Sequence, residues 1–354
     1  MCSDRNATCS VPDDIKNALI PVVFASDERF VPYLSTLIQS ILENSNPSNV
    51  YALFVLYGDI TDKSAGLIKD QVAVYSNFTI EFINVMDYIR DYTLWTENRQ
   101  EISRETYFRL LIPYIFTDFE KVIYLDCDMI CCTDLAELYD FKIGEYMLIS
   151  TRDIFGASAY YRSKNKKKRS KRYSIIGIKN HDDYLLAGTL VFNTAKFRET
   201  ISLKDLLNFA VSRKWPWHDQ DILNTLCEGK ILFIPIAWGY YDIGNYAHLP
   251  EYWQVQYLEA KKNIKIVHFV AGCKPWKNFY MIMHFDLFWK YATRTPFGDV
   301  IIDEMKRNGY VSQCDLSSAI LENIKHRRGI GLKLLLKGLF AWFRRDKKQS
   351  GEPG

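Results

Sequence analysis

Two carboxylates directly after an apolar strand are the strongest chemical feature of the sequence. Residues 121–125 (KVIYL) predict a buried strand, and Asp126 and Asp128 follow it with one residue between them. Ligands of open α/β sheets bind beyond the carboxyl ends of the strands. Two hard oxygen ligands there suit Mg²⁺ or Mn²⁺, which neutralises a bound diphosphate. Because this spacing is common, a loop with two solvated acids is the alternative interpretation.

A second polar segment, residues 268–276 (HFVAGCKPW), begins at the end of another apolar strand. The imidazole of His268 favours Mn²⁺ over Mg²⁺ as a metal partner. Gly272 permits close approach of the backbone to a ligand, and Lys274 is placed to meet a phosphate as a point charge. A lone histidine on an apolar strand is more often structural, so this segment alone does not establish a site.

Two further segments combine acids with a predicted helix start. In residues 217–224 (WHDQDILN), Asp219 could cap the following helix, and Asp221 is favourable in its first turn. Capping explains one acid but not the density of polar residues. After the first strand, Asp27 could contact a base or a ribose, or it could simply belong to a helix-entry turn.

Strand and helix patterns alternate between these polar segments. Strands are predicted at residues 18–25, 51–57, 79–85, 121–125, 147–151, 184–192, 231–236 and 265–269, and helices at 32–43, 61–75, 201–211 and 221–228. The alternation predicts an α/β fold with a mainly parallel, doubly wound sheet. Residues 162–172 are interpreted as an exposed loop, and residues 331–345 as an amphipathic basic helix.

The composition is that of an ordinary globular protein. Of the 354 residues, 48% are hydrophobic and 25% are charged, which excludes a disordered chain, a collagen and a disulfide-rich miniprotein. The eight cysteines form no CxxC pair, so they predict reduced thiols rather than a structural zinc site. We also expect no secretory signal, and no apolar run reaches the roughly 18 residues that span a bilayer.

Positive charge is concentrated in two segments. Eight of the eleven residues 162–172 are Lys or Arg and none is acidic, while residues 325–348 hold nine Lys or Arg and one acid. Because the whole chain has a formal charge of only +3, the remainder is acidic. The C-terminal segment predicts a helix that lies on an anionic membrane surface through Trp342 and Phe343, or alternatively one that packs on the domain.

The basic segment at residues 162–172 allows other interpretations. It could steer an anionic, lipid-linked partner, or it could merely be solvated. It lacks the interleaved aromatic residues of a base-stacking surface, so no nucleic-acid partner is expected.

Six segments together resemble glycosyltransferase family 8, the group of bacterial lipopolysaccharide galactosyl- and glucosyltransferases and glycogenin-like enzymes. They follow one another in unbroken order from about residue 20 to about residue 280. The matching segments are residues 24–28 (FASDE), 107–113 (YFRLLIP), 124–130 (YLDCDMI), 186–193 (LAGTLVFN), 218–224 (HDQDILN) and 268–276 (HFVAGCKPW).

The resemblance implies a GT-A fold, a UDP-sugar donor, Mn²⁺ (with Mg²⁺ possible) and retention at the anomeric carbon. It assigns the metal to Asp126, Asp128 and His268, and the ribose also to Asp126. The uracil is assigned to Ala25 and Asp27, and the diphosphate to Lys274 and the backbone near Gly272. The donor sugar is assigned to Arg109, Asp219, Gln220 and the segment of Gly188; Asp219 and Gln220 are the catalytic candidates, with Gln220 below the reacting carbon. Asp153 is a weaker candidate near the acceptor.

The chain departs from the family pattern in three places. Leu186 replaces an Asn that would contact the donor sugar, Arg29 stands where an Asn often contacts the ribose, and Gly272 comes one residue late, with Ala271 in its usual place. Because of the first departure, the identity of the donor sugar stays open. None removes a metal ligand, so the resemblance still implies an active enzyme.

The implied activity is transfer of glucose or galactose from a UDP-sugar to a glycan or lipid-linked acceptor, in lipopolysaccharide, capsule or other surface-polysaccharide synthesis. The expected setting is cytoplasmic, peripheral on the inner face of the membrane. A non-catalytic or hydrolytic UDP-sugar-binding protein is the alternative, whereas a two-metal phosphohydrolase would need more carboxylates. Attack on the face that UDP leaves and a covalent route through Asp219 both stay open.

The expected domain organisation has three parts. Residues 1–17 are an N-terminal tail, residues 18–280 form the catalytic domain, and residues 281–354 form a helical C-terminal extension that ends in the basic tail.

Overall fold

The computed structural model describes residues 19–96, 103–270, 272, 274–277 and 283–307. The predicted N-terminal tail and the predicted basic helix at residues 331–345 lie outside the described residues. Within the described part, no helix combines the length and the hydropathy needed to cross a membrane. The four cysteines of this part are unpaired, and three of them are buried.

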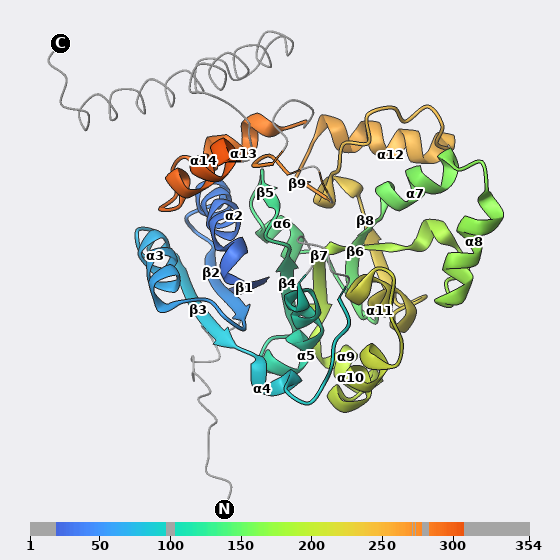
Figure 1. Cartoon of the computed structure of the whole chain (residues 1–354), viewed down its shortest axis with the longest axis horizontal. Coiled ribbons are helices and arrows are strands. Elements are labelled where there is room, and N and C mark those ends of the chain that lie inside the picture. The colour runs from blue at the N-terminus through green and yellow to red at the C-terminus, as the bar shows by residue number, and fades with distance from the viewer. Residues whose placement is uncertain (1–18, 97–102, 271, 273, 278–282, 308–354) are drawn as a thin grey trace, which may run out of the picture.

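A seven-stranded sheet with the order β3-β2-β1-β4-β7-β6-β8 forms the centre of the molecule (Figure 1). Its strands are β1 (Leu19–Ser26), β2 (Val50–Tyr57), β3 (Phe78–Asn84), β4 (Lys121–Leu125), β6 (Leu148–Arg152), β7 (Leu185–Asn193) and β8 (Ile231–Ile234). All neighbouring pairs are parallel except those of β7, which runs antiparallel to both β4 and β6. The predicted α/β class and the mainly parallel sheet are therefore confirmed.

Apolar layers lie on both faces of this sheet. Neighbouring residues of a strand point to opposite faces. Accordingly, Val22 and Val23 of β1 belong to different apolar clusters, and so do Ile123 and Tyr124 of β4. Burial on both faces explains why these strands are near-continuous hydrophobic runs in the sequence.

Helices cover the two faces and the ends of the sheet (Figure 1). They are α2 (Val31–Asn44), α3 (Asp62–Ala73), α4 (Met86–Ile89), α5 (Ile112–Ile115), α6 (Ala136–Tyr139), α7 (Ile154–Arg162), α8 (Lys166–Ile175), α9 (Thr194–Thr200), α10 (Leu203–Val211), α11 (His218–Leu226), α12 (Glu251–Lys262), α13 (Phe285–Ala292) and α14 (Gly298–Arg307). Short 3₁₀ segments add Glu28–Phe30, Arg104–Leu111, His181–Asp183 and Ile236–Gly239.

The structure corrects two sequence predictions. The basic segment at residues 162–172 is not a loop, because α7 ends at Arg162 and α8 begins at Lys166. The last predicted strand, β9 (Ile266–His268), does not belong to the central sheet but pairs antiparallel with β5 (Met129–Cys131). The three residues of β5 directly follow the acidic pair and were too few to give a strand pattern of their own.

The described helices after residue 280 pack on the rest of the described fold. α13 and α14 lie beside α2 and share an apolar cluster with Tyr33 and Trp276. The rings of these two residues stack with centroids 3.7 Å apart. This packing secures the segment after β9, which carries Lys274, against the rest of the domain.

Candidate active site

The small β5–β9 sheet brings the two strongest sequence signals together. Asp126 and Asp128 lie on the turn between β4 and β5, and Met129 of β5 pairs with His268 of β9. The turn is held on both sides, because the Asp126 amide donates to the carbonyl of Gly188 (2.9 Å) and the Phe269 amide donates to the carbonyl of Asp128 (3.0 Å). Backbone pairing therefore fixes where the three side chains meet.

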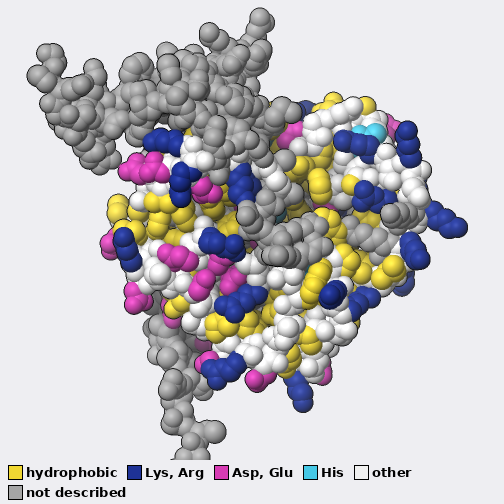
Figure 2. Space-filling view, in the orientation of Figure 1, with side chains coloured by type: hydrophobic (Ala, Val, Ile, Leu, Met, Phe, Trp, Pro, Cys, Tyr) yellow, Lys and Arg dark blue, Asp and Glu magenta, His cyan; other side chains and the backbone are white. Residues whose placement is uncertain are grey.

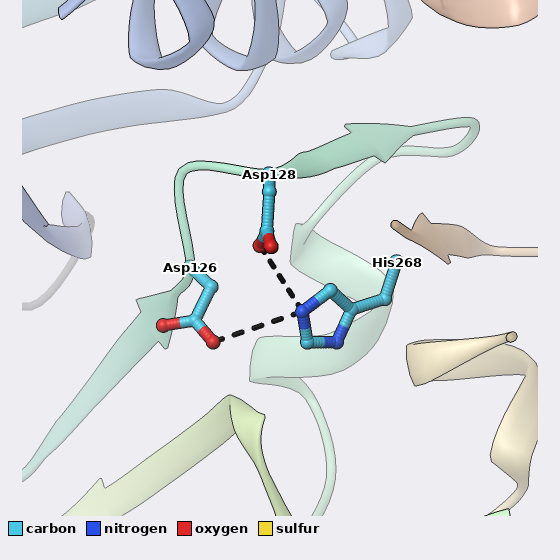
Figure 3. A group of neighbouring side chains, drawn as sticks. All are labelled: Asp126, Asp128 and His268. Atoms are coloured by element: carbon cyan, nitrogen blue, oxygen red, sulfur yellow. Dashed lines mark ion pairs between the residues drawn. The ribbon is translucent and has the colours of Figure 1, made fainter. Parts of the chain in front are cut away.

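Asp126, Asp128 and His268 point toward one another (Figure 3). His268 Nε2 lies 3.1 Å from Asp128 Oδ1 and 3.7 Å from Asp126 Oδ2. The potential ligand atoms of all three residues lie within 4.8 Å of one another. The His268 side chain is only 5% exposed, whereas that of Asp126 is 24% exposed, so the group opens to solvent on the Asp126 side.

These three residues fit a divalent cation. Ligands bonded to such an ion at roughly 2.0–2.2 Å lie about 3 Å apart when adjacent, close to the 3.1 Å between His268 Nε2 and Asp128 Oδ1. Asp128 Oδ1 is buried and has no hydrogen-bond partner among the described residues. A buried carboxylate oxygen left in this way is costly unless a cation or a donor satisfies it. The predicted metal triad is thus assembled in space, with one imidazole and two carboxylates as donors.

Lys274 reaches the same carboxylate from the other side. Its ammonium group bonds Asp128 Oδ2 and donates to the carbonyl of Phe269 (2.7 Å). Burial opposes ionisation of Asp128, but the charges of Lys274 and His268 outweigh it and hold the pKa of that carboxyl well below its usual range. Asp128 is therefore a carboxylate, the form that binds a metal.

Arg109 links the metal triad to α11. It lies in the 3₁₀ segment Arg104–Leu111, and its guanidinium pairs with Asp126 Oδ1 (2.8 Å) and Asp219 Oδ2 (3.0 Å). It also donates to the carbonyl of Ala187 (2.6 Å) and lies over the ring of Tyr124. These contacts fix the orientation of the planar guanidinium, which in turn positions the Asp126 carboxylate.

The start of α11 differs from the sequence prediction. Asp219 is not the helix cap, because the helix begins at His218, after Trp217. Asp221 lies in the first turn, as predicted, and its Oδ2 accepts from the Trp217 amide (2.9 Å). His218 has a left-handed backbone (φ 49°), which turns the chain sharply just before Asp219 and Gln220.

A cavity of about 510 Å³ opens over the triad. Of the predicted site residues it is lined by Ala25, Asp27, Arg109, Asp126, Asp128, Gly188, Gln220, His268 and Lys274, and also by the acceptor candidate Asp153. Two predicted residues are absent from this lining within the described part. Asp219 is buried behind Arg109, where Thr106 donates to it (2.5 Å), and Gly272 is exposed.

Several of the predicted residues have structural partners as well. Asp27 accepts from the Phe30 amide (3.0 Å) and from Arg29, so the helix-entry turn expected as an alternative is present. Gln220 Oε1 accepts from the Ala187 amide (3.0 Å), which fixes its side chain against β7. Asp27 and Gln220 still face the cavity. The contact of Asp27 with the uracil of the donor stays a prediction.

Sequence reasoning missed one wall of the cavity. Phe155 and Gly156 of α7 and Arg169 and Tyr173 of α8 line it, as does Glu105. None of them follows a strand directly, so the rule that located the other residues could not find them. Arg169 stood out only as one of many cations in a basic run.

Asp219 makes stability depend on pH. Burial raises the pKa of Asp219 to about 6, and the charge of Arg109 offsets this only in part. In an unfolded chain an aspartate titrates near ~3.9, so the folded state binds this proton more tightly. The resulting stabilisation is present below about pH 4 and is lost as the pH rises through about 6, a change of about 3 kcal/mol.

Urea unfolding of the metal-free protein and of Asp219→Asn checks this expectation. Relative to Asp219→Asn, the unfolding free energy of the wild type should fall between about pH 4 and about pH 7. The exposed Asp140 supplies a matched control, because Asp140→Asn should give a difference that stays nearly constant. A constant difference for Asp219→Asn as well would contradict the assignment.

Comparison with known proteins decides the family. The model for glycosyl transferase family 8 matches residues 21–279, which include all six segments singled out in the sequence. The chain belongs to glycosyltransferase family 8. Its acidic pair directly follows β4, a central strand of the sheet.

Among curated family relatives, the chain is similar to a Haemophilus influenzae protein provisionally named a glycosyltransferase. The two are 29% identical over 60% of this chain, which spans 61% of that protein's length. General stress protein A of Bacillus subtilis is 21% identical over 80% of this chain and 97% of its own length. The lipopolysaccharide glucosyltransferase WaaO of Escherichia coli is 23% identical over 80% of this chain and 78% of its own length.

Solved structures of two glycosyltransferases share the fold. The bifunctional glycosyltransferase WbbM superposes with a TM-score of 0.71 at 24% identity, covering 81% of this chain and 52% of that protein. The galactosyltransferase LgtC, solved with donor and acceptor sugar analogues, gives a TM-score of 0.63 at 22% identity and covers 78% of this chain and 96% of LgtC.

Proposed function

We propose that this family 8 chain transfers glucose or galactose from a UDP-sugar to a hydroxyl of a glycan or lipid-linked acceptor, with Mn²⁺ as cofactor. One observation carries the proposal: the two carboxylates of the β4–β5 turn and His268 converge in one cavity. The Asp128 oxygen that faces His268 is buried and forms no hydrogen bond with the described residues. Imidazole in the donor set supports Mn²⁺ over Mg²⁺.

The bound metal would be held by Asp126, Asp128 and His268 and would supply charge stabilisation for the departing diphosphate. Lys274 binds Asp128 and keeps it ionised, and it adds a positive charge beside the diphosphate. Arg109 orients Asp126, and Asp219 acts as a positioning residue that holds Arg109 from behind. The acceptor hydroxyl approaches on the face that UDP leaves, so that a phosphate oxygen takes its proton.

Leu186 and Gln220 are the residues that we place beside the donor sugar. Both line the cavity, and Leu186 lies where family members usually have an Asn. An apolar side chain offers that sugar contact but no hydrogen bond. The choice between glucose and galactose therefore falls to the other polar groups of the cavity, chiefly Gln220 and Arg109.

Surface-polysaccharide synthesis is the biological setting that we propose. The similarity to an Escherichia coli lipopolysaccharide glucosyltransferase supports it. A lipid-linked acceptor would place the enzyme on the inner face of the membrane, and the amphipathic basic composition of residues 331–345 suits contact with an anionic surface. Flotation with anionic liposomes after deletion of residues 331–354 tests this contact, which undiminished binding would refute.

Metal removal tests the proposed activity. Purified protein with Mn²⁺ should slowly hydrolyse UDP-glucose or UDP-galactose in the absence of acceptor, as measured by release of UDP. EDTA should abolish this release, and excess Mn²⁺ should restore it, because the triad would hold the ion by only three protein groups. Release that resists EDTA would contradict the metal assignment, and absence of UDP binding would contradict the transferase itself.

A further inference from the structure

We propose that the acceptor carries a phosphate group and that Arg169 of α8 binds it. This inference rests on the proposed transferase function and names the chemical class of its acceptor. It starts from the wall of the cavity that sequence reasoning did not predict, which is built by α7 and α8.

The α7–α8 wall is the part of the cavity that we assign to the acceptor. Arg169 and Tyr173 are one helical turn apart on α8, so both side chains face the same way and line the cavity. Phe155 and Gly156 of α7 complete this wall. Because α7 follows β6, the wall is separated from the donor-side strand β1 by β4 and β7.

Arg169 differs from the other cations of the cavity. Arg109 is held between Asp126 and Asp219, and Lys274 is bound to Asp128. The Arg169 side chain is exposed, and it forms no ion pair with any residue that the structure describes. A guanidinium that lines a cavity without a carboxylate partner presents its donors to a ligand, and its planar fork matches a phosphate.

The rest of α8 adds to this positive field. Lys164, just before α8, and Lys166, Lys167 and Lys171 within it are exposed and, within the described part, form no ion pair. Figure 2 shows Lys and Arg side chains gathered along the edge of the molecule where α7 and α8 lie. Lys167 and Lys171 are four residues apart on a helix that contains no acid, a spacing at which like charges repel. A bound dianion relieves that repulsion and is drawn in by the field.

Tyr173 gives this wall a fixed surface. Its ring is buried and packs against Tyr160, His181 and Tyr184, with centroids 6.4, 5.9 and 5.5 Å away. Its hydroxyl lies at the backbone of Gly156, where a side-chain Cβ would be only 3.3 Å away. Arg169 therefore projects from a helix whose inner side is anchored, which suits it to determine specificity.

Calorimetric titration of the full chain loaded with Mn²⁺ and UDP tests the proposal. Bound UDP fills the donor end, so a phosphate-bearing sugar has only the acceptor end available. We expect glucose 6-phosphate to bind about tenfold more tightly than glucose, as a charge-assisted hydrogen bond allows. Arg169→Gln should abolish that preference, Arg169→Lys should keep part of it, and Lys204→Gln, which removes an exposed charge on α10, should leave it intact.

Four results would overturn the inference. Equal binding of glucose 6-phosphate and glucose by the wild type, including no detectable binding of either, excludes a phosphate subsite. An unchanged preference in Arg169→Gln excludes this residue. Inorganic phosphate that binds as tightly as glucose 6-phosphate indicates a free-ion site. Loss of binding to phosphatidylglycerol vesicles in Arg169→Gln, with sugar-phosphate binding retained, assigns the residue to the membrane. Failure of the wild type to bind UDP is read separately and counts against the proposed function.

Discussion

Replacing Asp128 by Asn should reduce sugar transfer about a thousandfold or more. One carboxylate oxygen of Asp128 faces His268, and the other binds Lys274. Asp128 therefore connects the proposed metal site to the lysine that we place beside the diphosphate. Asn preserves the size and one acceptor oxygen but removes the negative charge that a divalent cation requires. The rate falls because the departing diphosphate loses the charge stabilisation that the bound metal would supply.

Two measurements separate this effect from unfolding. Mn²⁺ binding, followed by electron paramagnetic resonance, should weaken together with UDP release. The metal-free variant should still unfold in one cooperative transition, at a lower temperature because the buried Lys274 loses its counter-charge. Asp140→Asn is the matched control, since Asp140 is exposed and outside the cavity lining. Undiminished turnover or Mn²⁺ affinity in Asp128→Asn would remove the metal assignment.

The positions that sequence reasoning located are those tied directly to strand ends. Asp126 and Asp128 could be placed because β4 has a clear apolar run, and His268 could be placed because β9 ends at it. Their meeting could not be derived from the pattern, because it depends on β5, a strand of three residues, and on a second sheet. The reversed direction of β7 was equally hidden, since a strand buried on both faces shows no alternation in either direction.

The sequence pattern also could not predict which side chains pair with one another. Asp219 looked like a helix cap, but its partner is Arg109, which lies 110 positions earlier in the chain. The basic run at residues 162–172 looked like a loop because Lys and Arg show no apolar periodicity, yet it forms a helix anchored by Tyr173. Long-range contacts decided both cases, and these are not encoded in local spacing.

Gly188→Ala should impair metal binding without replacing any metal ligand. The sequence marked Gly188 as a residue of the donor-binding segment, and the structure gives it an additional reason to be glycine. A Cβ at this position would lie 2.3 Å from His268 Cε1 and 2.5 Å from Met129 Cε. The methionine can move aside, but the imidazole must shift away from Asp126 and Asp128. We expect UDP release to fall about a hundredfold or more, since displaced metal ligands cost at least as much as lost supporting contacts.

Gly66→Ala provides the comparison that isolates this steric effect. Gly66 lies inside α3 with no atom within 4 Å of its Cβ position, so Ala should raise the unfolding free energy by about 0.5–1 kcal/mol and leave activity unchanged. Overpacking at Gly188 should instead lower it by about 1–3 kcal/mol. Mn²⁺ affinity decides between the explanations, because a folded Gly188→Ala protein with wild-type affinity would show that His268 does not depend on this glycine. Weakened affinity, with UDP still bound once Mn²⁺ is in excess, would show that a backbone position on β7 determines where the histidine ligand stands.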